Sequence, residues 1–165
     1  MLFDIYDHRN GARSVALAER LGVENLIDGI RPPEGKLSPK DVTGRIREGL
    51  TELGWSGTVT VGRGTKITIT AERGDVGLAM QFGNISRIYA DLLKVQTLYI
   101  EGKIASAIII VPHNTLLQRL SHSGGLDNRC SFARVIRELP VFAKVITLPI
   151  LVYGVYSEGD VDVKQ

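Results

Sequence analysis

The chain has 165 residues, 44% of them hydrophobic and 23% charged, and its formal net charge of +2 is compatible with a nucleic-acid partner without identifying one. Its one cysteine, Cys130, excludes an internal disulfide and a cysteine-based metal site, and it favours a reduced, cytoplasmic setting. Charges precede the first apolar run, unlike a secretory signal, and the apolar runs are too short to cross a membrane, so we expect a soluble protein.

The N-terminal part of the sequence predicts one strand and two helices. Residues 1–6 are expected to form the strand. Apolar residues at helical spacing predict a helix over residues 12–21 that ends at a glycine. A loop rich in proline and glycine, residues 30–39, precedes a second helix, which would begin with Asp41 as its N-cap and run to Leu53.

From Thr58 onward the side chains alternate with the two-residue period of strands. Glycine-containing turns at residues 62–64 and 72–74 divide this region into three strands. Within it, residues 67–84, ITITAERGDVGLAMQFGN, read as two strands joined by a tight turn. We therefore expect a β-hairpin, with polar residues placed just past its second strand.

The strongest predicted helix follows this hairpin. Residues 85–101 carry a wide apolar stripe with helical spacing. Residues 104–112 form a continuous apolar run, which is typical of a strand buried on both faces. A polar loop over residues 121–128, a helix near 129–138 and a last strand over 146–156 complete the predicted elements.

This order of helices and strands predicts an α/β fold with a mixed β-sheet that has helices on both faces. The sequence contains no internal repeat and no sign of a second domain. We expect a single domain over residues 1–165, with its core at about residues 41–156.

The segment GTKITITAERGDVGLAMQFGN, residues 64–84, resembles the catalytic hairpin of PD-(D/E)-x-K nucleases. It is most similar to the type II restriction endonucleases that cut sites with a GATC core, whose second hairpin strand reads Glu-x-Gln-Phe-(Gly/Ser)-(Asn/Lys). The Tyr-x-Asp-Leu stretch from Tyr89, the strand of residues 104–112 and LPILVYGV, residues 148–155, match later parts of that pattern. The resemblance covers roughly residues 58–156. It implies a restriction-endonuclease-like fold, in which a metal-activated water hydrolyses DNA phosphodiesters.

Two carboxylates of that pattern are replaced in this sequence. Gln81 and the Phe-Gly-Asn that follows it match, but the glutamate position holds Ala79, and the aspartate position falls on Thr68 or Thr70. Mg²⁺ prefers anionic oxygen ligands, which alanine and threonine do not supply. The resemblance therefore implies a hairpin with the shape of a nuclease site and an impaired or inactive metal centre, and Mg²⁺ is expected only if the protein is active.

Other carboxylates are candidates to replace the missing ligands. Glu72 and Asp75 flank the hairpin turn, about 10 Å or more from the expected site because strand residues rise about 3.3 Å each; a solvated turn is the alternative explanation. Glu48 and Glu52 share one helix face, for which a solvated face paired with a neighbouring arginine is the alternative. In an active enzyme we expect the catalytic residues to be Gln81, Glu72 and Asp75, and the metal ligands to be Asp75 and Glu52.

DNA binding needs different groups from catalysis. Lysine and arginine neutralise phosphates, whereas amides and guanidinium groups read base edges. The resemblance places the residues just after the glutamine motif in the major groove, and these are Asn84, Ser86 and Arg87. Asn84 is equally suited to cap the helix that follows. Phosphate contacts are expected from the hairpin cations Arg63, Lys66 and Arg73.

Three functional classes remain open. The first is a DNA-binding protein of the restriction-endonuclease-like fold without catalysis, and the second is an active Mg²⁺-dependent DNA endonuclease with displaced carboxylate ligands. The third is a non-catalytic interaction module. We expect double-stranded DNA as the partner, no membrane, and a homodimer, because symmetric duplex sites are read by two-fold symmetric proteins.

Overall fold

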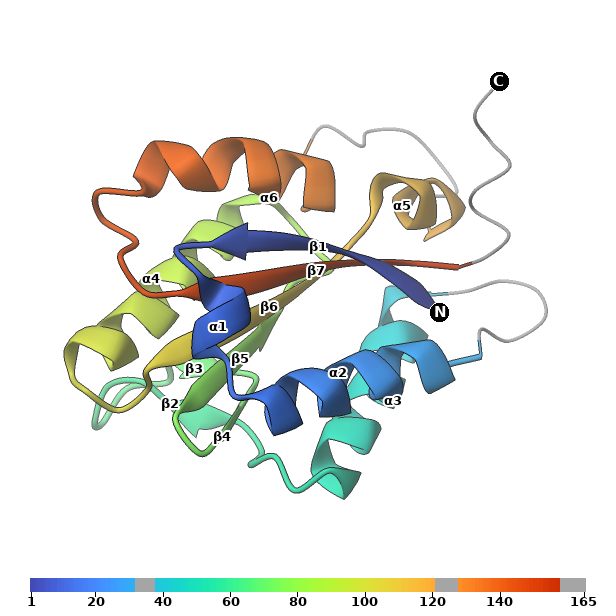
Figure 1. The fold of residues 1–165 in the computed structure, drawn as a ribbon. Coiled ribbons are helices and arrows are strands. Elements are labelled where there is room, and N and C mark those ends of the chain that lie inside the picture. The colour runs from blue at the N-terminus through green and yellow to red at the C-terminus, as the bar shows by residue number, and fades with distance from the viewer. Residues whose placement is uncertain (32–37, 121–127, 158–165) are drawn as a thin grey trace.

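The computed structural model describes residues 1–31, 38–120 and 128–157 (Figure 1). Its strands are β1 (Leu2–His8), β2 (Val59–Thr60), β3 (Thr68–Ile69), β4 (Ala71–Arg73), β5 (Val76–Met80), β6 (Ser106–Pro112) and β7 (Ile150–Tyr156). Its helices are α1 (Gly11–Ser14), α2 (Leu17–Gly29), α3 (Pro39–Glu52), α4 (Ser86–Ile100), α5 (Asn114–Leu120) and α6 (Phe132–Glu138), followed by a 3₁₀ turn, η1 (Leu139–Phe142). Among the described residues, the helices are too short or too polar to cross a membrane.

The main sheet has the strand order β1-β7-β6-β5-β4. Strands β5, β6 and β7 run parallel, whereas β1 and β4 pair antiparallel at the two edges. All residues of β6 are buried, which explains its unbroken apolar sequence. Strands β2 and β3 form a separate two-stranded sheet. The predicted mixed sheet is confirmed.

Helices cover both faces of the main sheet (Figure 1). On one face, α2 and α3 contribute Ile27 and Ile46 to a core with Leu78 of β5. On the other face, α4 and α6 contribute residues such as Leu98 and Val135 to a second core. The predicted α/β class with helices on both faces is therefore confirmed, and the two cores share one sheet.

The predicted helix over residues 12–21 is wrong in its bounds. The chain breaks near Val15, which is buried in an extended conformation, and α2 then continues through Gly22 to Gly29. A glycine inside a helix costs only about 1 kcal/mol relative to alanine. Burial of Val23 and Ile27, both fully covered, offsets that cost.

Helix α3 begins earlier than predicted. Its N-cap is Ser38, whose hydroxyl accepts a hydrogen bond from the Asp41 backbone N–H. The Asp41 carboxylate in turn accepts from the Ser38 backbone N–H at 3.0 Å, so Asp41 completes a capping box and is not the N-cap. Residues 32–37 of the predicted loop lie outside the described residues.

Helix α5 was not predicted, because its seven residues carry too short a pattern to read. The last strand begins at Ile150, directly after Pro149, and not at residue 146. Most of the predicted loop over residues 121–128 lies outside the described residues.

Gly154 lets α6 lie close to β7. A Cβ atom on this residue would lie 2.3 Å from Cγ of Phe132, the first residue of α6. We expect Gly154→Ala to lower the free energy of unfolding by about 2–3 kcal/mol, because a packed ring must move. Urea denaturation checks this, with Gly44→Ala as control, since a Cβ on Gly44 meets nothing within 4 Å. Equal stability of the two variants would contradict the prediction.

Candidate nucleic-acid interface

The hairpin that resembles a nuclease site is present. Strands β4 and β5 pair antiparallel, with Ala71 opposite Leu78. The turn between them contains Gly74, whose φ of +58° is left-handed and suits glycine. At its other end, the backbone N–H of Gln81 donates to the carbonyl of Ile110 on β6 at 3.0 Å. The end of β5 is thus anchored in the middle of the sheet.

The first strand of the hairpin bends at Thr70. Ile69 and Ala71 are two residues apart but belong to the cores on opposite faces of the sheet. A regular strand would place both on the same face. The Thr70 backbone N–H donates to the carbonyl of Leu78, and its hydroxyl accepts from the Met80 backbone N–H at 3.0 Å. These two hydrogen bonds fix the bend beside the end of β5.

An open cavity of about 400 Å³ lies at this bend. It is bordered by the hairpin, by α3 and by the first turns of α4. Its polar lining consists of Arg47, Arg87, Lys94, Asp91, Gln81, Thr58, Thr68 and Thr70. Three of these side chains are cations and one is a carboxylate, so the cavity has an excess of positive charge.

Asp91 supplies that carboxylate, and its oxygens are already bound. Its side chain is largely buried, and Oδ1 accepts from Nζ of Lys94 at 2.8 Å. Oδ2 accepts from Nε2 of Gln81 at 3.1 Å. The other end of the Gln81 amide, Oε1, accepts from the Gly83 backbone N–H at 2.9 Å. Asp91, Lys94 and Gln81 therefore form a satisfied network on the cavity wall.

The positions to which the resemblance assigns the two carboxylates lie in different surroundings. Thr68 and Thr70 both border the cavity. Ala79 is 2% exposed and packs in the core beneath α4, together with Ile88 and Leu92. It does not line the cavity. A methyl group of the core therefore occupies the position that the resemblance assigns to a glutamate.

The carboxylates suggested as replacements do not reach the cavity. Glu72 pairs with Gly77 near the turn, and Asp75 lies in the turn itself, where its carbonyl accepts from Ala105 and Ser106. Glu52 is exposed at the end of α3.

Helix α3 turns a different side chain towards the cavity. Glu48 lines a separate hollow with Arg45, whereas α3 contributes Arg47 to the cavity. Within the described residues, no three His, Cys, Asp or Glu side chains are grouped closely enough to hold a metal ion.

The residues after the glutamine motif lie at and just before the start of α4. Arg87 lines the cavity, whereas Asn84 and Ser86 are exposed and are not part of its lining. Oδ1 of Asn84 accepts from the Ser86 backbone N–H at 2.8 Å in a turn just before α4, whose N-cap is Ile85 without a side-chain cap hydrogen bond. The prediction of Asn84 as the N-cap of α4 is therefore wrong, and its amide N–H₂ group makes no hydrogen bond to another described residue.

The cations of the hairpin region differ in whether their side chains are exposed or bound to neighbouring elements. Arg63 and Lys66 are exposed between β2 and β3. Arg73 donates to the carbonyl of Leu53 at 2.6 Å and lies 3.7 Å from the Glu19 carboxylate. Arg73 is therefore bound to α2 and to the end of α3.

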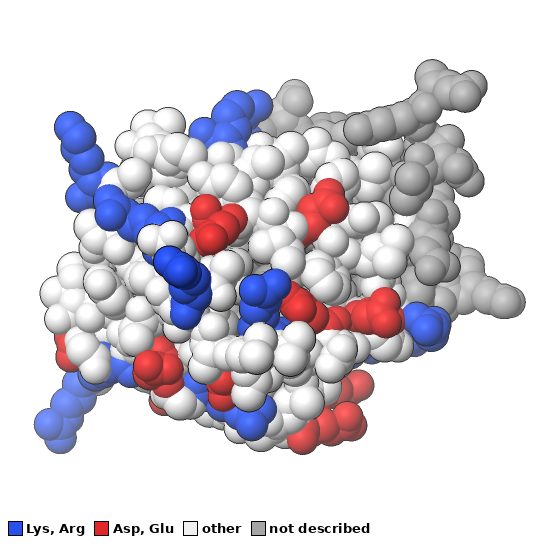
Figure 2. Space-filling model, viewed as in Figure 1, with Lys and Arg blue, Asp and Glu red and all other residues white. Residues whose placement is uncertain are grey.

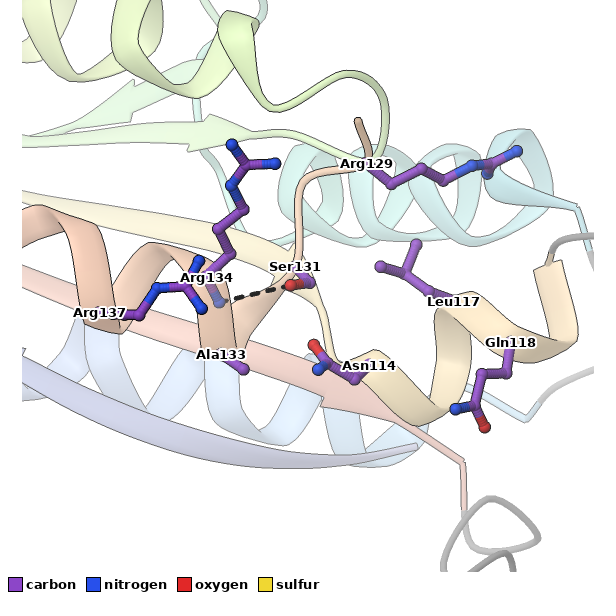
Figure 3. Close-up of a pocket in the computed structure, with 8 residues that line it drawn as sticks. All are labelled: Asn114, Leu117, Gln118, Arg129, Ser131, Ala133, Arg134 and Arg137. Carbon is purple, nitrogen blue, oxygen red and sulfur yellow. Dashed lines mark hydrogen bonds between the residues drawn. The ribbon is translucent and has the colours of Figure 1, made fainter. Parts of the chain in front are cut away.

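A second hollow, of about 280 Å³, lies between α5 and α6 (Figure 3). Arg134 and Arg137 project from α6, and Asn114 and Gln118 project from α5. Arg129 lies at its edge. The sequence did not identify these residues as a site. The three arginines at positions 129, 134 and 137 are the sequence feature that could have indicated this hollow.

Glu138 organises the arginines of the second hollow. It accepts from Nε of Arg134 at 2.9 Å, from Arg137 at 3.2 Å and from the Tyr89 hydroxyl of α4. Burial raises the pKa of the Glu138 carboxyl, but these hydrogen bonds outweigh burial and hold the pKa below its ordinary value. Glu138 therefore stays ionised and joins α6 to α4.

The two hollows are joined by the backbone. Asn84 forms a β-bridge with Arg129, and the Ile85 N–H donates to the carbonyl of Asn128 at 2.8 Å. The Cys130 N–H donates to the carbonyl of Gly83 at 2.9 Å.

Figure 2 shows basic and acidic side chains interspersed on the face it presents.

Cys130 is not a nucleophile in this site. It is fully buried, and burial, with a smaller contribution from the nearby Asp91 charge, raises the pKa of its thiol to about 12. The thiol is therefore protonated at neutral pH, whereas cysteine attacks as a thiolate.

Comparison with known proteins agrees with the fold. A solved structure of restriction endonuclease BglII complexed with a DNA 16-mer superposes with a TM-score of 0.80. The match covers 96% of this chain and 79% of that one, at 14% sequence identity. No curated protein matches the sequence. The family model described as restriction endonuclease BglII/BglIII matches residues 3–155, and the chain therefore belongs to that restriction endonuclease family.

Proposed function

We propose that this protein binds duplex DNA and does not cleave it by the metal-dependent reaction of its family. One observation carries the proposal: among the described residues, Asp91 is the single carboxylate that lines the cavity at the Thr70 bend, and both of its oxygens are bound by Lys94 and Gln81. Mg²⁺ requires several hard oxygen ligands in octahedral geometry. The residues of the cavity do not fit that ion, and we propose no cofactor.

The proposed DNA contacts lie along the rim that joins the two hollows. Arg63 and Lys66 are exposed cations beside the hairpin and suit phosphates. Asn84, Arg87 and Arg129 present an amide and two guanidinium groups, which pair with adenine and guanine edges. The BglII structure that resembles this chain was solved with DNA, which supports a duplex as the partner. Duplexes with a GATC core are the first probes to test.

We also propose that two copies form a homodimer through α4 and η1. Leu93 and Ile100 share one face of α4 with Tyr89 and are 54% and 75% exposed. Phe142 of η1 contacts the Tyr89 ring at a centroid distance of 5.6 Å, and Val141 beside it is 76% exposed. Such adjoining apolar side chains favour a protein partner, and a second copy fits a two-fold symmetric duplex site.

Leu93→Glu is expected to convert this dimer to a monomer, because a charge in an apolar interface loses its hydration without gaining a partner. Sedimentation velocity measures the change. Thr51→Glu is the matched control, since Thr51 is exposed on α3, which packs against the other face of the sheet, and its hydroxyl donates to the Arg47 carbonyl. A wild-type monomer, or a Leu93→Glu dimer, would contradict the proposed interface.

The test of the proposed function combines a mobility shift with plasmid incubation. The full chain is mixed with a GATC-core duplex at several salt concentrations, and with plasmid in Mg²⁺, in Mn²⁺ or in EDTA. We expect a shift whose affinity falls steeply with salt, and intact plasmid throughout. Metal-dependent cutting would instead identify an active endonuclease with ligands elsewhere, and the absence of any shift would leave a non-catalytic interaction module.

A further inference from the structure

We infer that the hairpin cavity binds a phosphate group directly, without a metal ion. The inference deepens the proposed function and rests on it in one respect: the phosphate would come from the DNA backbone. The chemistry of the cavity itself is that of an oxyanion site. A free phosphate and a DNA phosphodiester share that chemistry, and the experiment below separates them.

Two unpaired arginines border the cavity from different elements. Arg47 comes from α3 and Arg87 from the first turn of α4. Both are exposed, and neither guanidinium forms a hydrogen bond or an ion pair with another described residue. A guanidinium group is a planar, always charged donor that matches phosphate oxygens. The two arginines are thus free to bind an anion between them.

The negative charge of Asp91 does not cancel this attraction. Its carboxylate is bound to Lys94 at 2.8 Å and to the Gln81 amide at 3.1 Å, so its charge is largely compensated within the wall. Lys94 has three N–H donors, of which the contact with Asp91 uses one. Lys94 therefore both neutralises Asp91 and retains donors.

Hydroxyl groups complete the site where carboxylates would repel an anion. Thr58 and Thr68 line the cavity, and the Thr70 hydroxyl accepts from Met80, which leaves its own hydrogen free to donate. Threonine donates to phosphate oxygens, whereas aspartate at the same place would need a cation between itself and phosphate. The replacement of the carboxylate thus changes a cation-binding position into an anion-binding one.

The experiment measures binding of inorganic phosphate to the full chain by isothermal titration calorimetry in EDTA. We expect saturable binding that Mg²⁺ does not strengthen. The double variant Arg47→Gln/Arg87→Gln is expected to bind about tenfold more weakly or worse, because it loses both charge-assisted contacts. Arg13→Gln is the matched control, since Arg13 is also exposed but lies on α1, away from the cavity. Circular dichroism confirms that each variant folds.

Three results would overturn the inference: no saturable binding, binding that requires Mg²⁺, or equal binding by the double variant and Arg13→Gln. A second titration with a short GATC-core duplex separates this inference from the proposed function. Phosphate binding without duplex binding would support the oxyanion site and contradict the proposed function. If the double variant binds the duplex as strongly as the wild type, the proposed function would hold and the oxyanion site would be excluded as the DNA contact.

Discussion

Asp91→Asn is expected to lower stability and to tighten DNA binding at the same time. Asparagine removes the charge that Lys94 pairs with, and its amide N–H₂ group faces one of the two donors that now bind Asp91. Because the Lys94 side chain is about a quarter exposed, hydration of its ammonium group recovers part of the free energy lost with the ion pair. We expect the free energy of unfolding to fall by about 2 kcal/mol.

The gain in affinity follows from the same substitution. With Asp91 neutral, the cavity keeps its three cations and loses the one carboxylate that the described part of the chain places in its lining. We expect the duplex affinity to rise several-fold at low salt and the gain to shrink as salt is added. Urea denaturation and mobility shifts measure the two effects. Asp75→Asn, in the exposed hairpin turn, is the control and should change neither. Weaker duplex binding by Asp91→Asn would contradict the proposed role of this network.

Ala79→Glu is expected to lower the free energy of unfolding by about 3 kcal/mol or more. The Ala79 side chain is 2% exposed and lies among apolar residues beneath α4. A carboxylate there would be buried without a partner, and such a charge is strongly unfavourable. We therefore expect that a glutamate at the position assigned by the resemblance does not restore a metal site, because Ala79 is buried in the core.

Ala90→Glu is the matched control for this prediction. Ala90 is exposed on α4 and lines the cavity, so the same substitution should leave stability within about 0.5 kcal/mol. It should weaken duplex binding, because it adds a negative charge beside Arg87. Urea denaturation with and without Mg²⁺ tests both variants. An Ala79→Glu protein as stable as the wild type, and stabilised further by Mg²⁺, would mean that position 79 opens to the cavity.

The hairpin, α4 and the central strands were predictable because their patterns are local. The alternation through β5 and the apolar run of β6 are visible in the sequence. Gly22 misled the prediction of α2, since the burial of Val23 and Ile27 outweighs the helix propensity of one glycine. Propensity is a weak prior wherever tertiary contacts compete with it.

The partners of individual side chains were not predictable. The sequence marks Asp91 only as part of a family pattern, because its contacts with Gln81 and Lys94 depend on how α4 packs over the hairpin. Arg73 was expected to meet phosphate, but it is held by Leu53 and Glu19, which are far away in the sequence. Sequence spacing carries no information about such contacts.

We propose that the hairpin of this family member contacts phosphate without a metal ion. The most direct measurement is a calorimetric titration of Mn²⁺ into the protein–duplex complex, with the duplex alone as the reference and the DNA inspected for cuts afterwards. We predict no saturable heat beyond that of the duplex and uncut DNA. A stoichiometric Mn²⁺ site accompanied by cleavage would contradict the claim and identify an active nuclease.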